Sequence, residues 1–110
     1  VSSSKDDNKT RSVKLVQPTE SVGTTTTTII SNGVRAGTVL VTGNEDGTGG
    51  VFFVDLLIFA ESASATVIAS ETRFGPASRS YSVSGGDLDL AMGSGTYNVV
   101  AESNVMESTL

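Results

Sequence analysis

Residues 51–60 (VFFVDLLIFA) are the only stretch of this chain that is apolar on both faces of a β-strand. Successive side chains of a strand point to opposite faces, so alternate residues share a face. A small β-domain buries one such face in its core and leaves the other in water. Two apolar faces therefore predict two partners: the domain's own core, and a second surface that we expect to be another copy of the chain.

We assign the subunit interface to the face that contains the single charge of this stretch. That face carries Val51, Phe53, Asp55, Leu57 and Phe59. The opposite face, which includes Phe52 and Leu56, is the alternative, and the sequence does not decide between them.

The rest of the chain is a series of short apolar or β-branched segments separated by glycine-rich turns. Such spacing, without a helical period, predicts an all-β fold, an antiparallel β-sandwich of jelly-roll type assembled as a homotrimer. The expected strands are residues 12–16, 23–30, 37–42, 51–60, 65–69, 79–84, 87–92 and 96–102. Residues 43–50 and 70–78 are expected to be loops. Alternation places Tyr81 and Tyr97 toward the core.

Charge divides the chain into an arm and a body. Residues 1–20 hold four basic and three acidic side chains (net +1), so the total of −5 leaves −6 for the remainder. We therefore predict a polar linker over 1–20 and one domain over 21–110. An acidic body disfavours nucleic acid as a partner. No apolar run approaches the length that spans a bilayer, so we expect no membrane insertion.

Catalysis has little support in the sequence. The chain contains no His and no Cys, which removes the usual nucleophile–base pairs. Asp87 and Asp89 share a strand face, a pattern that a solvated face explains better than a glycosidase carboxylate pair. Asn44, Glu45 and Asp46 lack the alternating ligand spacing of a calcium loop. We expect no catalytic residue, no cofactor and no metal.

Asp55 needs a partner wherever its face is buried, because burying an unpaired carboxylate costs several kcal/mol. Two interpretations stay open. Asp55 lies at a wet rim or pairs with Arg35, Arg73 or Arg79 of the same chain; alternatively, it lies at a subunit interface and fixes its register through an intersubunit hydrogen bond. Arg79 is an attractive partner because the body has only three basic side chains.

The order of segments resembles the C-terminal β-domains of bacteriophage tail fibres and tailspikes. The resemblance rests on SVGTTTTTIISNGVRAGTVLVTG, then GGVFFVDLLIFAESASATVIAS, then RSYSVSGGDLDLAMGSGTYNVVAES. It implies a homotrimer of β-sandwiches at the distal end of a fibre in the virion tail. Such domains drive trimer assembly, contact the host surface, or both. It also implies that any polysaccharide-cleaving activity belongs to an upstream domain that this chain does not contain.

Recognition concentrates in loops carried on a rigid sandwich, so the two expected loops are the candidate receptor contacts. Their candidate residues are Asn44, Glu45, Asp46, Thr48, Arg73 and Phe74. The expected partner is a host cell-surface polysaccharide or protein. The alternative function is a monomeric carbohydrate-binding module of a secreted enzyme. Residues 51–60 discriminate between the two, because a monomer would leave one of their apolar faces exposed.

Overall fold

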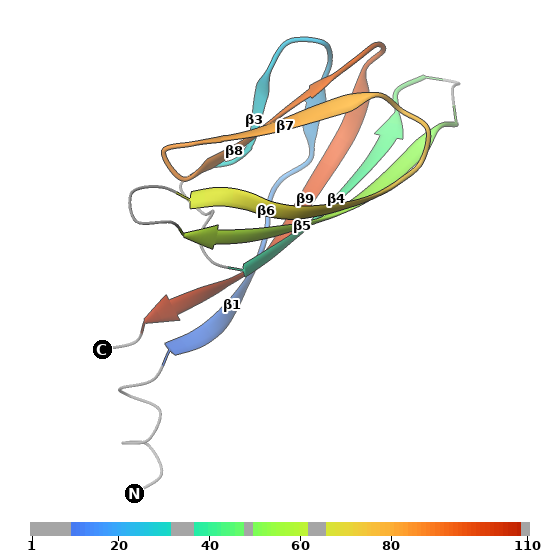
Figure 1. The fold of residues 1–110 in the computed structure, drawn as a ribbon. Helices are drawn as coiled ribbons and strands as arrows, with labels where there is room; N and C mark the ends of the chain where they lie inside the picture. The colour runs from blue at the N-terminus through green and yellow to red at the C-terminus, as the bar shows by residue number, and fades with distance from the viewer. Residues whose placement is uncertain (1–9, 32–36, 48–49, 62–65, 109–110) are drawn as a thin grey trace, which may run out of the picture.

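The computed structural model of the chain describes residues 10–31, 37–47, 50–61 and 66–108. Within these ranges it contains nine strands (Figure 1). Their bounds are β1 Thr10–Val16, β2 Glu20–Val22, β3 Thr27–Ile30, β4 Gly37–Glu45, β5 Phe52–Glu61, β6 Thr66–Phe74, β7 Arg79–Ser84, β8 Asp87–Met92 and β9 Tyr97–Ser108.

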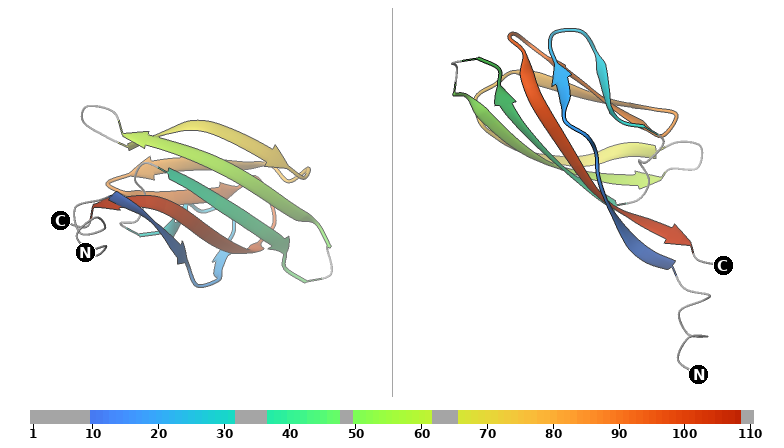
Figure 2. Two further views of the ribbon diagram at one scale, coloured as in Figure 1. Left: turned by 90° about the horizontal axis from the view of Figure 1, so that it is seen from below. Right: turned by 180° about the vertical axis from the view of Figure 1, so that it is seen from behind.

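The strands form two antiparallel sheets that lie face to face (Figures 1 and 2). The six-stranded sheet has the order β1-β9-β4-β5-β6, with β2 also paired to β9. The three-stranded sheet has the order β3-β8-β7. The all-β, antiparallel part of the fold prediction is thus confirmed.

Several strands are longer than the sequence pattern indicates. β4 continues to Glu45 and β6 continues to Phe74, so each extends into a segment expected to be a loop. The polar residues of β6 remain extended because they pair with β5 from Glu61↔Thr66 to Val54↔Phe74. Strand β1 pairs with β9 from Thr10↔Ser108 to Val16↔Glu102, so the six-stranded sheet begins within the segment expected to be a linker.

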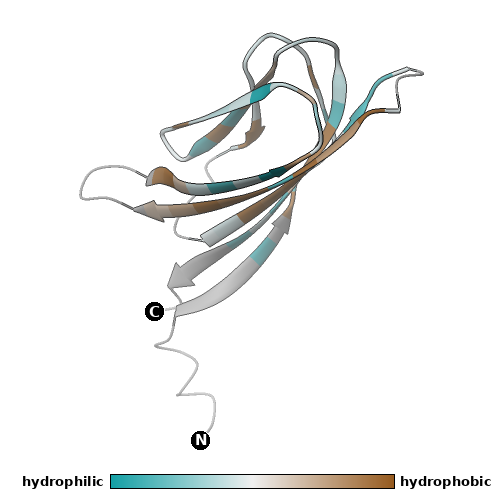
Figure 3. Ribbon diagram, turned by 45° about the vertical axis from the view of Figure 1, so that its right-hand side comes forward, coloured by the Kyte–Doolittle hydropathy of each residue, from teal (hydrophilic) through white to brown (hydrophobic). Residues whose placement is uncertain are grey.

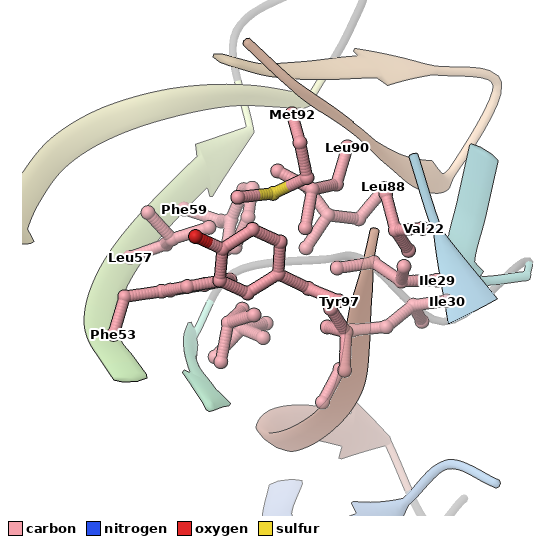
Figure 4. Packing of buried hydrophobic residues seen from close by; sticks show 14 residues of the cluster. Val22, Ile29, Ile30, Phe53, Leu57, Phe59, Leu88, Leu90, Met92 and Tyr97 are labelled. Carbon is pink, nitrogen blue, oxygen red and sulfur yellow. The ribbon is translucent and has the colours of Figure 1, made fainter. Parts of the chain in front are cut away.

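The core fills the space between the two sheets (Figure 4). The three-stranded sheet contributes Leu88, Leu90 and Met92 from β8, whose alternating burial matches its apolar–acidic sequence. Its neighbour β3 contributes Ile29 and Ile30. From the six-stranded sheet come Val22, Val39, Val41, Phe53, Leu57, Phe59, Tyr97, Val99 and Ala101. Each sheet therefore has one apolar face that the other sheet covers.

Two glycine positions show why this residue is required. Gly85 and Gly86 join β7 to β8 with φ of 58° and 87°, the left-handed backbone of a tight hairpin turn. Gly43 lies in β4 opposite Phe53, and a Cβ atom there would be 2.1 Å from the Phe53 ring. The core packing of Phe53 therefore depends on the missing side chain of Gly43.

Candidate functional site

The face of β5 that contains Asp55 is buried inside the chain's own core. Phe53 is 1% exposed, Asp55 and Leu57 are both 0% exposed, and Val51 packs partly buried against this cluster. Phe59 is buried with them. These side chains have no surface to offer a second copy, so the assignment of this face to the subunit interface is wrong. The physical reason is that the three-stranded sheet covers it.

The opposite face of β5 belongs to the outer surface of the six-stranded sheet, which we call the outer face. Strand pairing aligns Leu56 with Leu40 of β4 and Val54 with Phe74 of β6. Large hydrophobic side chains that are exposed in the described residues all map by register to this face: Val16, Leu40, Phe52, Val54, Leu56, Ile58, Val67 and Phe74. Figure 3 shows β5 coloured as hydrophobic over most of its length. The outer face is thus a concentrated apolar surface.

Charge on the outer face is confined to its margin. Across the described residues of β4, β5 and β6, the outer positions are apolar, Thr, Ser or Asn. At the edge formed by β1 and β9, Lys14 Nζ lies 2.7 Å from Glu102 Oε1 in an ion pair. A partner that covered β4–β6 would therefore not have to desolvate a charge of this chain.

Asp55 finds its partners on β7, within the same chain. Arg79 donates from Nε to Asp55 Oδ2 at 2.6 Å and from Nη2 to Oδ1 at 2.5 Å, a bidentate pair. The Tyr81 hydroxyl donates to Asp55 Oδ2 at 2.5 Å. Of the two interpretations, pairing with Arg79 is confirmed, and the intersubunit hydrogen bond is excluded by full burial of Asp55. Arg35 lies outside the described residues.

The buried cluster raises the pKa of two of its members, Arg79 and Tyr81. The hydrogen bond from Arg79 to Asp55 raises the pKa of the guanidinium, against the opposing effect of burial. Burial, assisted by the hydrogen bond to Asp55, raises the pKa of the Tyr81 hydroxyl above its ordinary value. Both groups therefore keep their protons across the physiological range, and the Arg79 charge is balanced by the Asp55 carboxylate.

The described receptor-contact candidates gather at one end of the sandwich, which we call the loop end. It comprises residues 44–47, 74–78 and 93–96. Backbone hydrogen bonds join these segments: Asp46 N–H donates to Thr96 O at 2.8 Å, and Gly93 N–H donates to Ser78 O at 2.7 Å. The start of β1 and the end of β9 lie together at the opposite end (Figure 1).

Individual candidates at the loop end differ in what they contact. Phe74 is 65% exposed, whereas Arg73 donates to the Arg79 carbonyl at 2.7 Å and forms an ion pair with Glu71. Asn44 and Glu45 belong to β4, and the Asp46 carboxylate accepts the Gly47 N–H at 2.9 Å. Thr48 lies outside the described residues. The structure thus brings most of the candidates together at one end, with Arg73 held by internal contacts.

The described part of the chain contains neither a cluster of metal-ligating side chains nor a helix that could cross a membrane. No group of three or more acidic side chains is placed there to hold a metal ion. Asp89 accepts a hydrogen bond from the Thr28 hydroxyl at 2.7 Å across the β3–β8 pair. Among the same described residues, no helix has the length and apolarity needed to cross a membrane.

Sequence reasoning kept the face of residues 51–60 that holds Val54 and Ile58 as the alternative interface, but it missed the outer-face residues Leu40 and Val67 on the neighbouring strands. The signal for Leu40 is present in the alternation of residues 37–42 (GTVLVT) and 51–60. In both segments apolar residues occupy consecutive positions, which places apolar groups on both faces of neighbouring strands. Pairing the two strands in register would have shown that Leu40 and Leu56 extend one surface.

No protein-family model and no curated protein sequence matches the chain. Among solved structures, the fold is similar to part of the tailspike protein gp49 of Acinetobacter baumannii bacteriophage Fri1, a capsular polysaccharide depolymerase, with a TM-score of 0.52 and 15% identity. A second match, at a TM-score of 0.49 and 18% identity, is the tailspike protein of Acinetobacter phage vB_ApiP_P1.

Both matches cover most of this chain and a small share of the tailspikes. The first covers 94% of this chain and 18% of the Fri1 protein; the second covers 89% of this chain and 21% of the other tailspike. The likeness to the Fri1 protein shows a shared fold, which there forms one portion of a much longer chain.

Proposed function

We propose that this chain is a β-sandwich domain of a phage tail fibre or tailspike, which assembles as a homotrimer and contacts the host cell surface without catalytic activity of its own. Its expected place is the distal, C-terminal end of the fibre in the virion tail. The fold shared with part of the Fri1 tailspike supports the setting. The proposed homotrimer rests on the concentration of exposed hydrophobic side chains on the outer face.

Self-association explains the outer face better than exposure to water does. Monomeric proteins rarely expose contiguous apolar patches larger than a few hundred Å². Phe52 is 59% exposed, Phe74 is 65% exposed and Ile58 is 43% exposed, and all three lie on this face. Copies of one chain carry the same patch, and rotational symmetry buries every patch in a closed assembly. The charge-free surface of β4–β6 removes the main electrostatic cost of bringing copies together.

The loop end is the part of the domain that we assign to the host partner, a cell-surface polysaccharide or protein. It lies opposite the start of β1 and the end of β9, where preceding sequence would enter. Its segments are tied to one another by backbone hydrogen bonds. A surface of this kind, built from short connections on a rigid sandwich, is the usual location for recognition residues.

The assembly is tested by light scattering on the purified chain. The monomer mass is 11.3 kDa, and a homotrimer would have about three times that mass. Leu56→Glu places a charge at the centre of the outer face and should give folded monomers. Ser80→Glu, on an exposed position of β7 in the other sheet, is the matched control and should stay assembled. A wild-type chain that is monomeric at micromolar concentration would favour the alternative of a monomeric binding module.

Host contact is tested by binding of the fluorescently labelled assembly to a panel of encapsulated bacteria and to purified capsular polysaccharides. We expect Asp46→Ala, at an exposed position of the loop end outside the outer face, to weaken binding to a recognised host without changing the oligomeric mass. Product release from the polysaccharides would contradict the assignment of no catalytic activity.

A further inference from the structure

The Arg79 side chain makes a complete set of hydrogen bonds inside the domain. A guanidinium has five N–H groups in a fixed fork, and each of the five finds an acceptor here. Two N–H groups bind the Asp55 carboxylate. The other three bind backbone carbonyls of the β6–β7 connection: Phe74 O at 3.2 Å, Gly75 O at 3.4 Å, and Ala77 O at close range.

The guanidinium is itself held in one orientation from the core side. The Asp55 carboxylate accepts from both Nε and Nη2, which fixes the plane of the fork. Phe53 lies beneath it, with the Arg79 Cζ atom 4.4 Å from the ring centroid. Tyr81 donates to the same carboxylate and restrains Asp55 in turn. Arg79 is 7% exposed and Asp55 is 0% exposed, so water competes little for these bonds.

Residues 75–78 of the connection are fixed at further points. Gly75 has a φ of +106°, and a Cβ atom there would be 2.5 Å from the Phe52 carbonyl oxygen. The connection therefore lies directly against the start of β5. At its other end, Ser78 O accepts the Gly93 N–H of the β8–β9 connection at 2.7 Å. A loop that contacts a core arginine, β5 and a neighbouring connection is held in one conformation.

We propose that Arg79, oriented by Asp55, is a positioning residue that preforms the loop end by fixing residues 75–78 from inside the core. This deepens the proposed function, because these residues lie in the segment assigned to the host partner. A loop that is already ordered loses little conformational entropy when a partner binds, which improves affinity without adding a contact. The buried ion pair therefore acts on recognition through the loop backbone, while its own side chains stay out of reach of the partner.

Two neighbouring amides offer an internal control for this proposal. Gly93 N–H donates to Ser78 O, and Met92 N–H donates to Gly23 O at 2.8 Å. Global unfolding exposes both amides equally, whereas opening of residues 75–78 alone releases Gly93 and leaves Met92 bonded. The ratio of their hydrogen-exchange rates therefore measures local opening of the loop, separately from global stability.

The test variant is Arg79→Lys, which keeps the charge but has one nitrogen in place of the fork. We expect Gly93 to exchange at least about tenfold faster relative to Met92, since hydrogen bonds from a charged group are lost from three carbonyls. Tyr81→Phe, which leaves the bonds of Arg79 to these carbonyls in place, should not change the ratio. An unchanged ratio in Arg79→Lys, or equal acceleration of both amides, would show that Arg79 is a stabilising core residue only.

If Arg79→Lys does not fold, the order of the loop can be measured directly by NMR in the wild-type chain. In the wild-type chain, the backbone order parameters of Gly75, Ala77 and Ser78 should equal those of rigid strands, about 0.85, whereas values under about 0.6 would overturn the proposal. Asp55→Asn should lower these order parameters while disturbing the core less than Arg79→Lys does. Because neither readout needs a partner, a chain that fails to trimerise or to bind a host would overturn the proposed function and leave this inference intact.

Discussion

The two faces of β5 have nearly the same apolar composition but opposite environments. The inner face carries a carboxylate and is buried; Asp55 and Leu57 are both 0% exposed. The outward-facing residues of β5 carry no charge, yet Leu56 is 40% exposed and Phe52 is 59% exposed. A charge within an apolar strand therefore does not mark the side of the strand that faces solvent. Here the charge is tolerated inside because Arg79 and Tyr81 satisfy it.

The two faces of β5 should respond very differently when the same charge is placed on adjacent residues. Leu57→Glu inserts an unpaired carboxylate into the core and should destabilise the fold by on the order of 5 kcal/mol or more, close to the whole stability of a small domain. Leu56→Glu should fold. Circular dichroism and thermal melting of the two variants measure the difference, and equal stability would mean that the faces are not distinct.

A smaller effect should follow from removing the inner carboxylate alone. Asp55→Ala leaves the Arg79 guanidinium buried without its counter-ion, which should cost about 3–5 kcal/mol in the free energy of unfolding. Urea denaturation measures this loss. The double variant Asp55→Leu with Arg79→Met replaces the pair by apolar groups and should recover most of the stability. If the double variant stays unstable, the hydrogen bonds from Arg79 to the loop carbonyls must contribute substantially to the free energy of unfolding.

The inner face should also respond to alkaline pH. Below about pH 10 the Tyr81 hydroxyl is protonated in both states. Above it, the unfolded chain loses this proton while folded Tyr81, whose pKa is raised chiefly by burial, keeps it. The unfolded state then binds fewer protons, so stability falls as pH rises, by up to about 1.4 kcal/mol per pH unit. In Tyr81→Phe the free energy of unfolding should fall less steeply above pH 10 than in the wild-type chain. Denaturant midpoints measured across this pH range give both curves, and parallel curves would contradict the prediction.

The smallest effect is expected at the margin of the outer face. Lys14→Ala removes the ion pair with Glu102, in which the Lys14 side chain is 61% exposed. Exposed pairs of this kind contribute about 0–1 kcal/mol, and salt screens them. When Lys14→Ala is introduced into the monomeric Leu56→Glu variant, we expect the melting temperature to change little at either low or high salt. A large loss of stability in this background that salt does not reduce would contradict the exposed, screened character of the pair.

Alternation along the strands predicted much of the fold. It placed Leu88, Leu90 and Met92 inside and Tyr97 in the core, as the structure shows. Separately, the scarcity of basic side chains in the body identified Arg79 as an attractive partner of Asp55. What alternation did not decide was the inward face of β5, because both faces are apolar and the deciding contact comes from a residue 24 positions away. Local pattern carries no information about such a distant pair.

The positions of the strand ends could not be predicted from the local sequence pattern either. Residues 70–74 (SETRF) are mostly polar and favour a loop by composition. They form the end of β6 because β5 extends far enough to pair with them. Likewise, the Lys- and Ser-containing β1 forms a strand along the long β9. In both cases the partner's free hydrogen-bonding edge determines the structure, and propensity is overridden. The sequence indicated two of the loop-end segments as loops, within residues 43–50 and 70–78. It did not indicate the backbone hydrogen bonds that join them through residues 93–96.

The antiparallel pairing of β1 with β9 has a mechanical consequence. Thr10 lies opposite Ser108 at one end of the sandwich, and the loop end lies at the other. A pull applied between the two ends of the chain would open the β1–β9 hydrogen bonds one pair after another. A pull applied between β1 and the loop end would run along the strands and strain the bonds from Thr10↔Ser108 to Val16↔Glu102 together. The domain should therefore resist tension between Thr10 and the loop end far better than tension between Thr10 and Ser108.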